Sequence, residues 1–555
     1  MSRLRPRLQT RTGGLFGAAG RAGCGRRWLC FTLLLAVVVA VAPAITAPAV
    51  AVAAEPAVQQ LGQRLGECLG REDPVCIRGV LDAISASAGA GFTLRFAEGS
   101  LALLEARHEE AALLLGALAA DESAPPVLRK RAAGLAAVAS ASATITANAK
   151  RVPIVDGSFE VWVEPGPDEL LLPLLDAVLR RAAPALTKVF GPLPAAPIRV
   201  LIYARPSQLA ETTGLTEAQI KASGTIAVCK YNRLMVTSPR ALVFGYPWAD
   251  TVVHELIHLL VTRRGSDRVP VWLHEALARS HEGLWRGADP KALDLEERVL
   301  LDRARRRRAF VTLRQMSPSI AALPSQEKAQ LAFAEVHHLL AWLLADEQRT
   351  VAGLLGHFAA GQDEDEALAA WTGGTTARWQ STWWSALRRG AGYQAPPADA
   401  EPSLPLAFKG DAGKQETNQR GQRYVELGDR LLALERPLAA VLEYQRARAK
   451  GAPADVLMST RLARALLAIG RLDDAAREVD RALARFPQHA PLVLVAGKVA
   501  LAAGDAERAL HHAEDALHLN PFDPGVHALG AAASEKLGRG DEAALWRARG
   551  RRAGR

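Results

Sequence analysis

The sequence predicts an α+β fold, with a small mixed sheet and packed helices in the middle of the chain and an all-α repeat array after them. Two strand-like stretches, FEVWV at 159–163 and IRVLIY at 198–203, lie on either side of a helical segment. Apolar residues with helical spacing continue to about residue 390. Beyond residue 420, glycine and alanine recur at a step of 34 residues, which indicates stacked helical units.

The composition is that of a globular protein and gives no support to a nucleic-acid partner. Of its residues, 49% are hydrophobic and 23% are charged, as in globular proteins. A chain of 555 residues is too long for a single hydrophobic core, so several domains are expected. Its net charge is +10, but residues 1–27 hold seven arginines and no acid, and residues 28–54 hold no charge. The rest of the chain carries a net charge of only +3, so a basic footprint for nucleic acid is not expected.

Residues 1–54 are predicted to be a secretory signal sequence or an N-terminal anchor. The arginines precede an apolar run that ends in small residues, which is the layout of a signal with A-x-A-like cleavage sites. The mature protein is therefore expected to be exported, either periplasmic or secreted. The same apolar run is long enough to span a bilayer, so an uncleaved membrane anchor stays open as the alternative.

Residues 55–150 are predicted to be a helical N-terminal region, because Ala- and Leu-rich stretches keep helical spacing up to a break at two consecutive prolines. His108 and Glu109 resemble the beginning of a zinc motif, but Ala112 stands where the second histidine would be. We therefore interpret His108 as part of a solvated helix face.

Three cysteines follow the leader. After export, Cys68 and Cys76 are expected to form a disulfide, with two free thiols on neighbouring helices as the alternative. No CxxC motif is present, so a zinc site built from cysteines is not expected.

Residues 151–392 are predicted to form one domain. The stretch 224–239 is expected to add one or two strands to the two above, and the segment after it is helical. A proline-rich stretch without periodicity then predicts a linker at 393–420.

The segment 421–550 carries an internal repeat and is expected to fold as a separate unit. Gly470, Gly504 and Gly538 stand 34 residues apart, and alanines recur with the same step. Small residues let paired helices approach closely, and glycine permits the turns. The pattern resembles the tetratricopeptide repeat, and this resemblance implies three to four repeats that bind a protein partner.

The strongest signal for function is HELIH, from His254 to His258, inside an apolar run. On an α-helix the two histidines lie on one face about 6 Å apart, so both can bind one zinc ion at about 2.0–2.1 Å. Glu255 is turned about 100° from His254, which directs its carboxylate to the water that the metal activates. The alternative is a core helix, but its polar side chains would then need partners, at about 1–3 kcal/mol for each unpaired group.

A third ligand is expected shortly after this motif. The stretch PVWLHEALA places Glu275 on a second helix that begins after Pro270, beyond a short polar turn. The predicted metal site is therefore His254, His258 and Glu275, with Glu255 as the general base.

Residues 153–390 resemble the peptidase MA-like domains, relatives of thermolysin and the zinc aminopeptidases. After the HExxH helix this family has P-x-W-L-x-E-G-x-A, and Ala276 replaces its glycine here. The resemblance implies a gluzincin-like metallopeptidase fold, one Zn²⁺ per chain and hydrolysis of peptide bonds. Phe333 stands where the family often has a tyrosine, so no hydroxyl donor is expected at that position.

The donor that would stabilise the oxyanion stays open among five residues, namely His281, His337, His338, Tyr231 and Tyr246. Asp250, one helical turn before His254, is expected to orient a zinc histidine. We expect His274 to lie on the surface, and the run Arg305–Arg308 to be a solvated face.

Together these observations predict an exported zinc metallopeptidase that acts on a peptide or protein substrate, with a protein partner bound by the repeats. The alternative of a different class is a catalytically inactive scaffold with a protease fold, which acts through its repeats. Glu255 favours the enzyme, because a scaffold has no need of a general base. A non-peptidase zinc hydrolase also stays open, and contact with a membrane is expected only if the leader is not cleaved.

Overall fold

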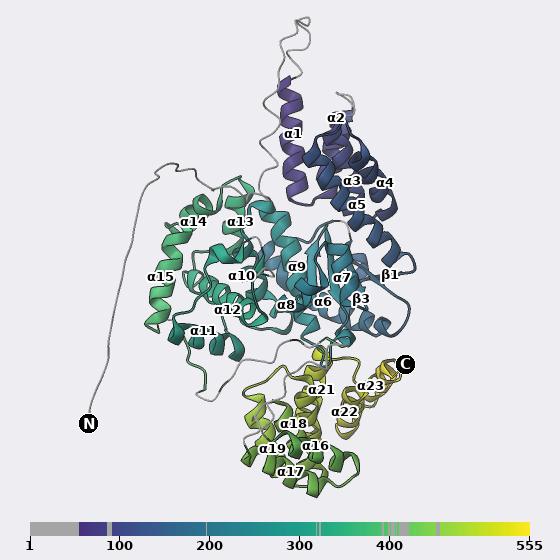
Figure 1. Ribbon diagram of the computed structural model, residues 1–555, viewed down its shortest axis with the longest axis vertical. Helices are drawn as coiled ribbons and strands as arrows, with labels where there is room; N and C mark the ends of the chain where they lie inside the picture. Colours follow the sequence, from purple (N-terminus) through teal and green to yellow (C-terminus); the bar gives the residue numbers. More distant parts are fainter. Residues whose placement is uncertain are drawn as a thin grey trace, which may run out of the picture. The chain divides into compact units, whose positions relative to one another are not determined.

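The computed structural model describes residues 55–554, except for 86–90, 196, 318, 321–322, 391–392, 398–399, 401–405, 407, 410–420 and 451–455 (Figure 1). The predicted leader and most of the predicted linker lie outside the described residues. Within them, the predicted α+β architecture with an all-α C-terminal region is confirmed.

In the described part of the chain, five strands form one mixed sheet with the order β1-β2-β3-β5-β4. The strands β2, β3 and β5 run parallel, and β1 and β4 pair antiparallel at the two edges. The two predicted strands are present as β2 and β3, and the stretch 224–239 forms two strands. Only β1 was not predicted, because its sequence has no alternating pattern. The bounds are β1 (Lys150–Ile154), β2 (Phe159–Val163), β3 (Ile198–Tyr203), β4 (Ala227–Lys230) and β5 (Arg233–Thr237).

Helices α6 to α15 belong to the same part of the chain as the sheet. Their bounds are α6 (Leu171–Phe190), α7 (Pro206–Thr213), α8 (Glu217–Ser223), α9 (Trp248–Gly265), α10 (Val271–His281), α11 (Leu295–Arg307), α12 (Gln326–Leu343), α13 (Val351–Ala359), α14 (Glu364–Thr372) and α15 (Thr376–Arg388). The run that was predicted to be solvated ends α11, and Arg306, Arg307 and Arg308 are exposed.

The helix α9 carries the HELIH motif and is buried on most of its circumference. It packs against β4, β5, α6, α10 and α13, and apolar residues of different faces, such as Val252, Val253 and Leu256, are buried. A helix that is apolar all round belongs in a core. Packing therefore carries the polar residues of the motif into the interior.

The N-terminal region is helical, as predicted, with α1 (Glu55–Gly70), α2 (Pro74–Ser85), α3 (Phe92–Leu104), α4 (His108–Ala120) and α5 (Pro126–Thr146). The predicted disulfide between Cys68 and Cys76 is confirmed, and it joins the end of α1 to the beginning of α2.

The interpretation of His108 as part of a solvated face is wrong. Its side chain is 5% exposed, its Nδ1 lies 3.2 Å from Oγ1 of Thr146, and its Nε2 contacts the guanidinium of Arg233 on β5. The beginning of α4 faces the sheet, so this histidine is buried between the two parts.

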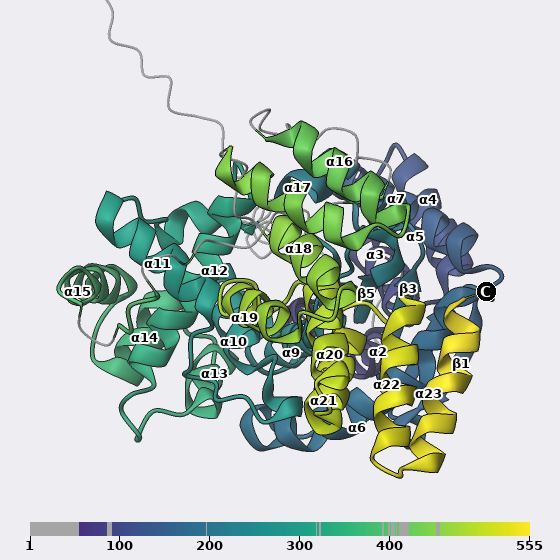
Figure 2. The same ribbon diagram turned by 90° about the horizontal axis from the view of Figure 1, so that it is seen from below.

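The repeat array consists of helices that lie side by side in successive pairs, as Figure 2 shows for α22 and α23. The pairs are α16 (Gln422–Ala433) with α17 (Pro437–Ala449), α18 (Val456–Ala468) with α19 (Leu472–Leu483), α20 (Ala490–Ala502) with α21 (Ala506–Leu519), and α22 (Pro524–Lys536) with α23 (Gly540–Ala553). No helix among the described residues is both long and apolar enough to cross a membrane.

The expectation that this array forms a separate unit does not hold for its last repeats. Apolar residues of α16 to α19 form a cluster of their own with part of α20. In contrast, Val493, Leu517, Leu529 and Trp546 belong to the same apolar cluster as the sheet and α9. The last two helix pairs therefore share a core with the middle of the chain.

His108 is expected to make the stability of the fold depend on pH. Burial and the charge of Arg233 lower the pKa of His108 to about 3, whereas an unfolded histidine has a pKa of about 6.5. Between these values only the unfolded chain binds the proton, so the free energy of unfolding falls as the pH drops. We expect His108 to remove about 2 kcal/mol of stability at pH 5 relative to pH 8.

Denaturant unfolding at both pH values measures this effect. His108→Gln should lose about 2 kcal/mol less than the wild type on acidification. His511→Gln, which changes an exposed histidine, should lose as much as the wild type. Equal losses for the wild type and His108→Gln would contradict the assignment.

Candidate metal centre

Two consecutive helices, α9 and α10, carry the predicted site residues. At the end of α9, a Cβ atom on Gly265 would lie 2.3 Å from Cγ2 of Val269, so the tight reversal of the chain requires glycine. The next helix begins after Pro270, as predicted. The reversal sets α10 against α9, with Glu275 facing the two histidines.

The structure brings His254, His258 and Glu275 together. The Nε2 atoms of His254 and His258 lie 3.3 Å and 3.4 Å from the same atom, Oε2 of Glu275. The three atoms lie within 4.8 Å of one another, and this is the one group of its kind in the described residues.

The charges of this cluster depend on one another. Burial alone lowers the pKa of His254, but hydrogen bonds with Glu275 and Glu282 outweigh it and raise that pKa to about 10. Burial raises the pKa of Glu275, but the charges of His258 and His254 lower it further than burial raises it. The cluster therefore keeps an ionised carboxylate beside the imidazole of His254, which holds its proton strongly, and a divalent cation would compete with that proton.

Glu282 orients His254 from the residue that follows α10. Its Oε2 accepts a hydrogen bond from Nδ1 of His254 over 2.8 Å, which leaves Nε2 directed at Glu275. Arg279 binds Glu282 and also two further carboxylates, those of Asp294 and Glu297. This arginine therefore ties the cluster to α11.

Glu282 was not among the predicted residues. It stands seven residues after Glu275, which is two helical turns along the same face, and this spacing could have found it. The predicted role of Asp250 is wrong, because its Oδ1 accepts a hydrogen bond from Nε1 of Trp285 over 2.7 Å and its carboxylate pairs with Arg286. Both of these partners follow α10, three and four residues after Glu282.

Glu255 lies on a different face of α9 from the histidines. Its side chain is 6% exposed, and its Oε2 has no hydrogen-bond partner. The backbone amide of Cys229 on β4 faces this carboxylate and lowers its pKa. Burial raises the pKa of Glu255 above its ordinary value, against the lowering effect of His258 and His254. A buried carboxylate with a raised pKa and an unpaired oxygen is suited to accept a proton from water.

The five candidates for the oxyanion donor make hydrogen bonds and ring contacts with residues outside this cluster. These contacts join His281 with Ser280, His337 with Glu297, His338 with Trp383, Tyr246 with the carbonyl of Thr237, and Tyr231 with the side chains of Lys230 and Arg233.

Two other rings lie beside the histidines. The ring centroid of Phe333 is 6.3 Å from that of His254, and the ring centroid of His274 is 5.6 Å from that of His258. His274, which was expected on the surface, is half-buried, and burial lowers its pKa to about 3. His274 lies next to His258 because it directly precedes Glu275, which contacts the same histidine.

Comparison with known proteins identifies the domain that contains this cluster. Residues 179–389 match the family model of the Peptidase MA superfamily, so the chain contains a domain of this superfamily. The match includes the whole of α9 and α10. No curated protein matches the chain.

Several solved structures resemble parts of the chain. A thermophilic TPR protein of Thermus thermophilus is 26% identical over 23% of this chain and 72% of its own, with a TM-score of 0.22. MamA is 18% identical over 25% of this chain and 81% of its own, with a TM-score of 0.22. Yeast LTA4 hydrolase is 12% identical over 73% of this chain and 66% of its own, with a TM-score of 0.30. TM-scores this low do not establish a common fold.

The contact between Glu282 and His254 leads to a prediction about metal affinity. Glu282→Gln removes the carboxylate that fixes the orientation of the imidazole, so the affinity for Zn²⁺ should fall by about 10- to 100-fold. Competition titration with a chromophoric chelator measures the affinity. Asp250→Asn is the matched control, because this carboxylate binds Trp285 and Arg286 and should leave the affinity nearly unchanged. The assignment fails if both variants bind Zn²⁺ as the wild type does.

Proposed function

We propose that the protein is an exported, zinc-dependent peptidase in which His254, His258 and Glu275 hold the metal and Glu255 is the general base. The observation that supports this most is the meeting of two imidazole nitrogens and one carboxylate oxygen on α9 and α10. The superfamily match over the same helices supports hydrolysis of peptide bonds as the reaction.

The donor set fits zinc in both chemistry and spacing. Zinc binds imidazole nitrogen and carboxylate oxygen at about 2.0–2.1 Å in tetrahedral sites, whose ligand atoms stand about 3.3 Å apart. The separations of 3.3 Å and 3.4 Å between the Nε2 atoms and Oε2 of Glu275 agree with this geometry. When bound, the zinc ion would lower the pKa of a water molecule and polarise the carbonyl of the substrate.

The residues of the chain supply the proton transfer and the alignment. Glu255 takes the proton of the attacking water and afterwards returns it to the leaving amine. Glu282 keeps His254 in one orientation through its hydrogen bond to Nδ1. Burial of Glu255 under the sheet excludes bulk water from its carboxylate.

The sheet offers a place for an extended peptide. Among the described strands, β4 lies at the edge and pairs only with β5, and it packs against α9. We infer that the backbone groups on its outer side, other than the amide of Cys229 that faces Glu255, pair with an added strand, the mode by which sheet edges bind peptides. A peptide bound there would run past Glu255 and the cluster, so we infer a peptide or protein substrate and, for the repeat array, a protein partner.

One observation favours a scaffold without catalysis. The ring beside His254 is that of Phe333, which has no group to stabilise an oxyanion. The two functions differ in whether they need the carboxylate of Glu255.

Glu255→Gln separates the two functions. The change keeps the size of the side chain but removes its ability to accept a proton, so peptide hydrolysis should fall by about 10² or more. Bound zinc should stay at one per chain, because this residue is not proposed to be a ligand. Hydrolysis is measured on a peptide library, and zinc by elemental analysis.

Two ligand variants complete this experiment. His258→Ala should lose zinc after mild chelation and reconstitution, and Glu275→Gln should bind it more weakly, because a neutral amide is a poorer ligand. Equal zinc in His258→Ala and the wild type would refute the metal site. The scaffold function would be supported instead by two results together: the fully zinc-loaded wild type hydrolyses no peptide, and Glu255→Gln keeps the biological activity of the wild type.

Export is proposed from the leader and tested separately. If the signal is cleaved at an A-x-A-like site, the exported protein should begin between about residues 47 and 56. N-terminal sequencing of the periplasmic or secreted fraction determines this. An intact leader recovered in the membrane fraction would show an anchor instead.

A further inference from the structure

The turn between β4 and β5 has a backbone conformation that its residues do not favour. Tyr231 and Asn232 both have a φ of 57°, in the left-handed region. This conformation costs about 1–2 kcal/mol for a residue with a side chain, and two-residue hairpin turns of this kind prefer Asn-Gly. Such a turn persists only when surrounding contacts hold it.

Glu72, in the N-terminal helical region, holds the turn in this conformation. Its Oε1 accepts a hydrogen bond from the backbone N–H of Tyr231 over 3.0 Å, and its Oε2 accepts one from the backbone N–H of Asn232. One carboxylate therefore binds both amides of the turn. Glu72 itself has a φ of 49°, so its own position also depends on contacts around it.

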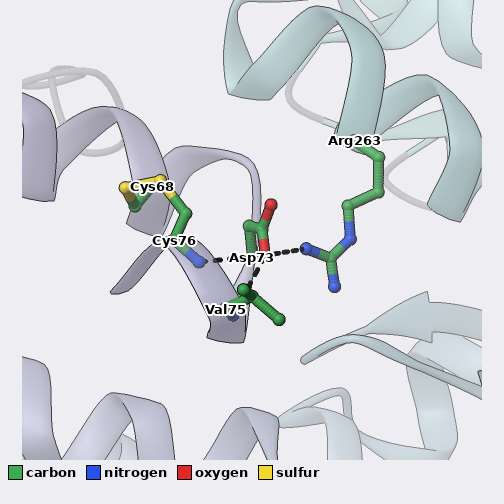
Figure 3. The surroundings of a disulfide bond; sticks show 5 residues. All are labelled: Cys68, Asp73, Val75, Cys76 and Arg263. Carbon is green, nitrogen blue, oxygen red and sulfur yellow. Dashed lines mark hydrogen bonds and ion pairs between the residues drawn. A yellow bond between two sulfur atoms is a disulfide. The ribbon is translucent and has the colours of Figure 1, made fainter. Parts of the chain in front are cut away.

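The loop that carries Glu72 is closed by the disulfide between Cys68 and Cys76. Within this loop, Asp73 accepts hydrogen bonds from the backbone N–H groups of Val75 and Cys76 at the beginning of α2, and it pairs with Arg263 of α9 over 3.0 Å (Figure 3). The guanidinium of Arg263 also donates to Oδ1 of Asn232. The disulfide-closed loop, residues 68–76, thus contacts both the turn and the last part of α9.

The β4–β5 turn also affects the position of β4 beside Glu255, the proposed general base. The strand packs against α9, and the backbone amide of Cys229, two residues before Tyr231, faces the carboxylate of Glu255. The strand has four residues and pairs with β5 alone, so the turn that joins the two strands helps to fix its position beside α9, against which it packs. A shift of about 1 Å in a catalytic group can cost about 10² in rate.

We propose that Glu72 is a positioning residue for the catalytic base: by binding both amides of the β4–β5 turn, it keeps β4 and the backbone amide of Cys229 beside the carboxylate of Glu255. The Cys68–Cys76 disulfide holds Glu72 in the position that this requires. The N-terminal helical region thereby contributes to catalysis without touching the substrate. The effect on rate rests on the proposed peptidase function, whereas the hold on the turn does not.

Hydrogen exchange and kinetics of the full, zinc-loaded chain test this proposal. In Glu72→Ala, the amides in a peptide spanning 227–237 should exchange at least about ten-fold faster, while those of α10 keep wild-type rates. The kcat should fall by about 10- to 100-fold with KM and zinc content nearly unchanged. Glu72→Gln keeps one acceptor oxygen and should give an intermediate effect, and it replaces Glu72→Ala if the latter does not fold.

Asp82→Asn is the matched control, because Asp82 is an exposed carboxylate on α2, next to the same loop. It should leave exchange and kcat as in the wild type. The proposal is overturned if the amides of 227–237 exchange at the wild-type rate in Glu72→Ala. It is also overturned if exchange becomes faster throughout the domain and zinc is lost, because Glu72 would then only stabilise the fold. If the loaded wild type hydrolyses no peptide, the proposed function fails, and exchange alone then decides whether Glu72 holds the turn.

The disulfide is tested with the double variant Cys68→Ser/Cys76→Ser. Its 227–237 amides should exchange faster and its kcat should fall in the same direction as in Glu72→Ala, without loss of zinc. Wild-type exchange and kcat in the double variant would overturn the role of the disulfide and leave Glu72 acting without it.

Discussion

The polar side chains of α9 lie inside an apolar core, and the arrangement of the rest of the domain depends on providing partners for them. An unpaired buried polar group costs about 1–3 kcal/mol. Glu275 on α10 contacts the two histidines, Glu282 binds Nδ1 of His254, and the backbone amide of Cys229 on β4 faces Glu255. Each partner comes from a neighbouring element, so the metal-type cluster exists only when α9, α10 and the sheet edge are packed together.

The same helix is held at both ends by regions outside the superfamily domain. At its end, Arg263 pairs with Asp73 of the N-terminal region. At its beginning, Nε1 of Trp248 donates to the carbonyl of Leu517 on α21 over 3.0 Å. Just before α9, a Cβ atom on Gly245 would lie 2.3 Å from the carbonyl oxygen of Leu519, so the close approach of the array requires glycine there. The helical regions on either side of the domain thus fix where α9 lies.

One arginine, Arg279, links several carboxylates of the domain. Arg279 binds Glu282, Asp294 and Glu297, and Glu297 accepts a hydrogen bond from Nδ1 of His337. Removal of one member of a buried ionic network leaves an uncompensated charge, at about 3–5 kcal/mol. Such a network gives each carboxylate one well-defined orientation, and Glu282 passes that orientation on to His254.

The sequence by itself determined what depends on short distances along the chain. The step of 3.6 residues per turn places His254 and His258 on one face of a helix and Glu255 on another, wherever that helix lies. The α+β class followed from periodicity, the helix pairs of the array from a 34-residue step, and the disulfide between Cys68 and Cys76 from the expected export of the chain.

Only the tertiary structure decided which distant groups meet. Asp250 and Glu282 are both carboxylates near the motif. The packing of α10 against α9 brings Glu282 to His254, whereas Asp250 binds Trp285. The burial of His108 depends on where α4 meets the sheet, and the hold of Glu72 on the β4–β5 turn joins residues about 160 positions apart. Helical periodicity acts over a few residues and is written in the sequence, so it can place Glu282 on the face of Glu275. Whether such a residue meets His254, His108 the sheet or Glu72 the turn depends on how whole elements pack.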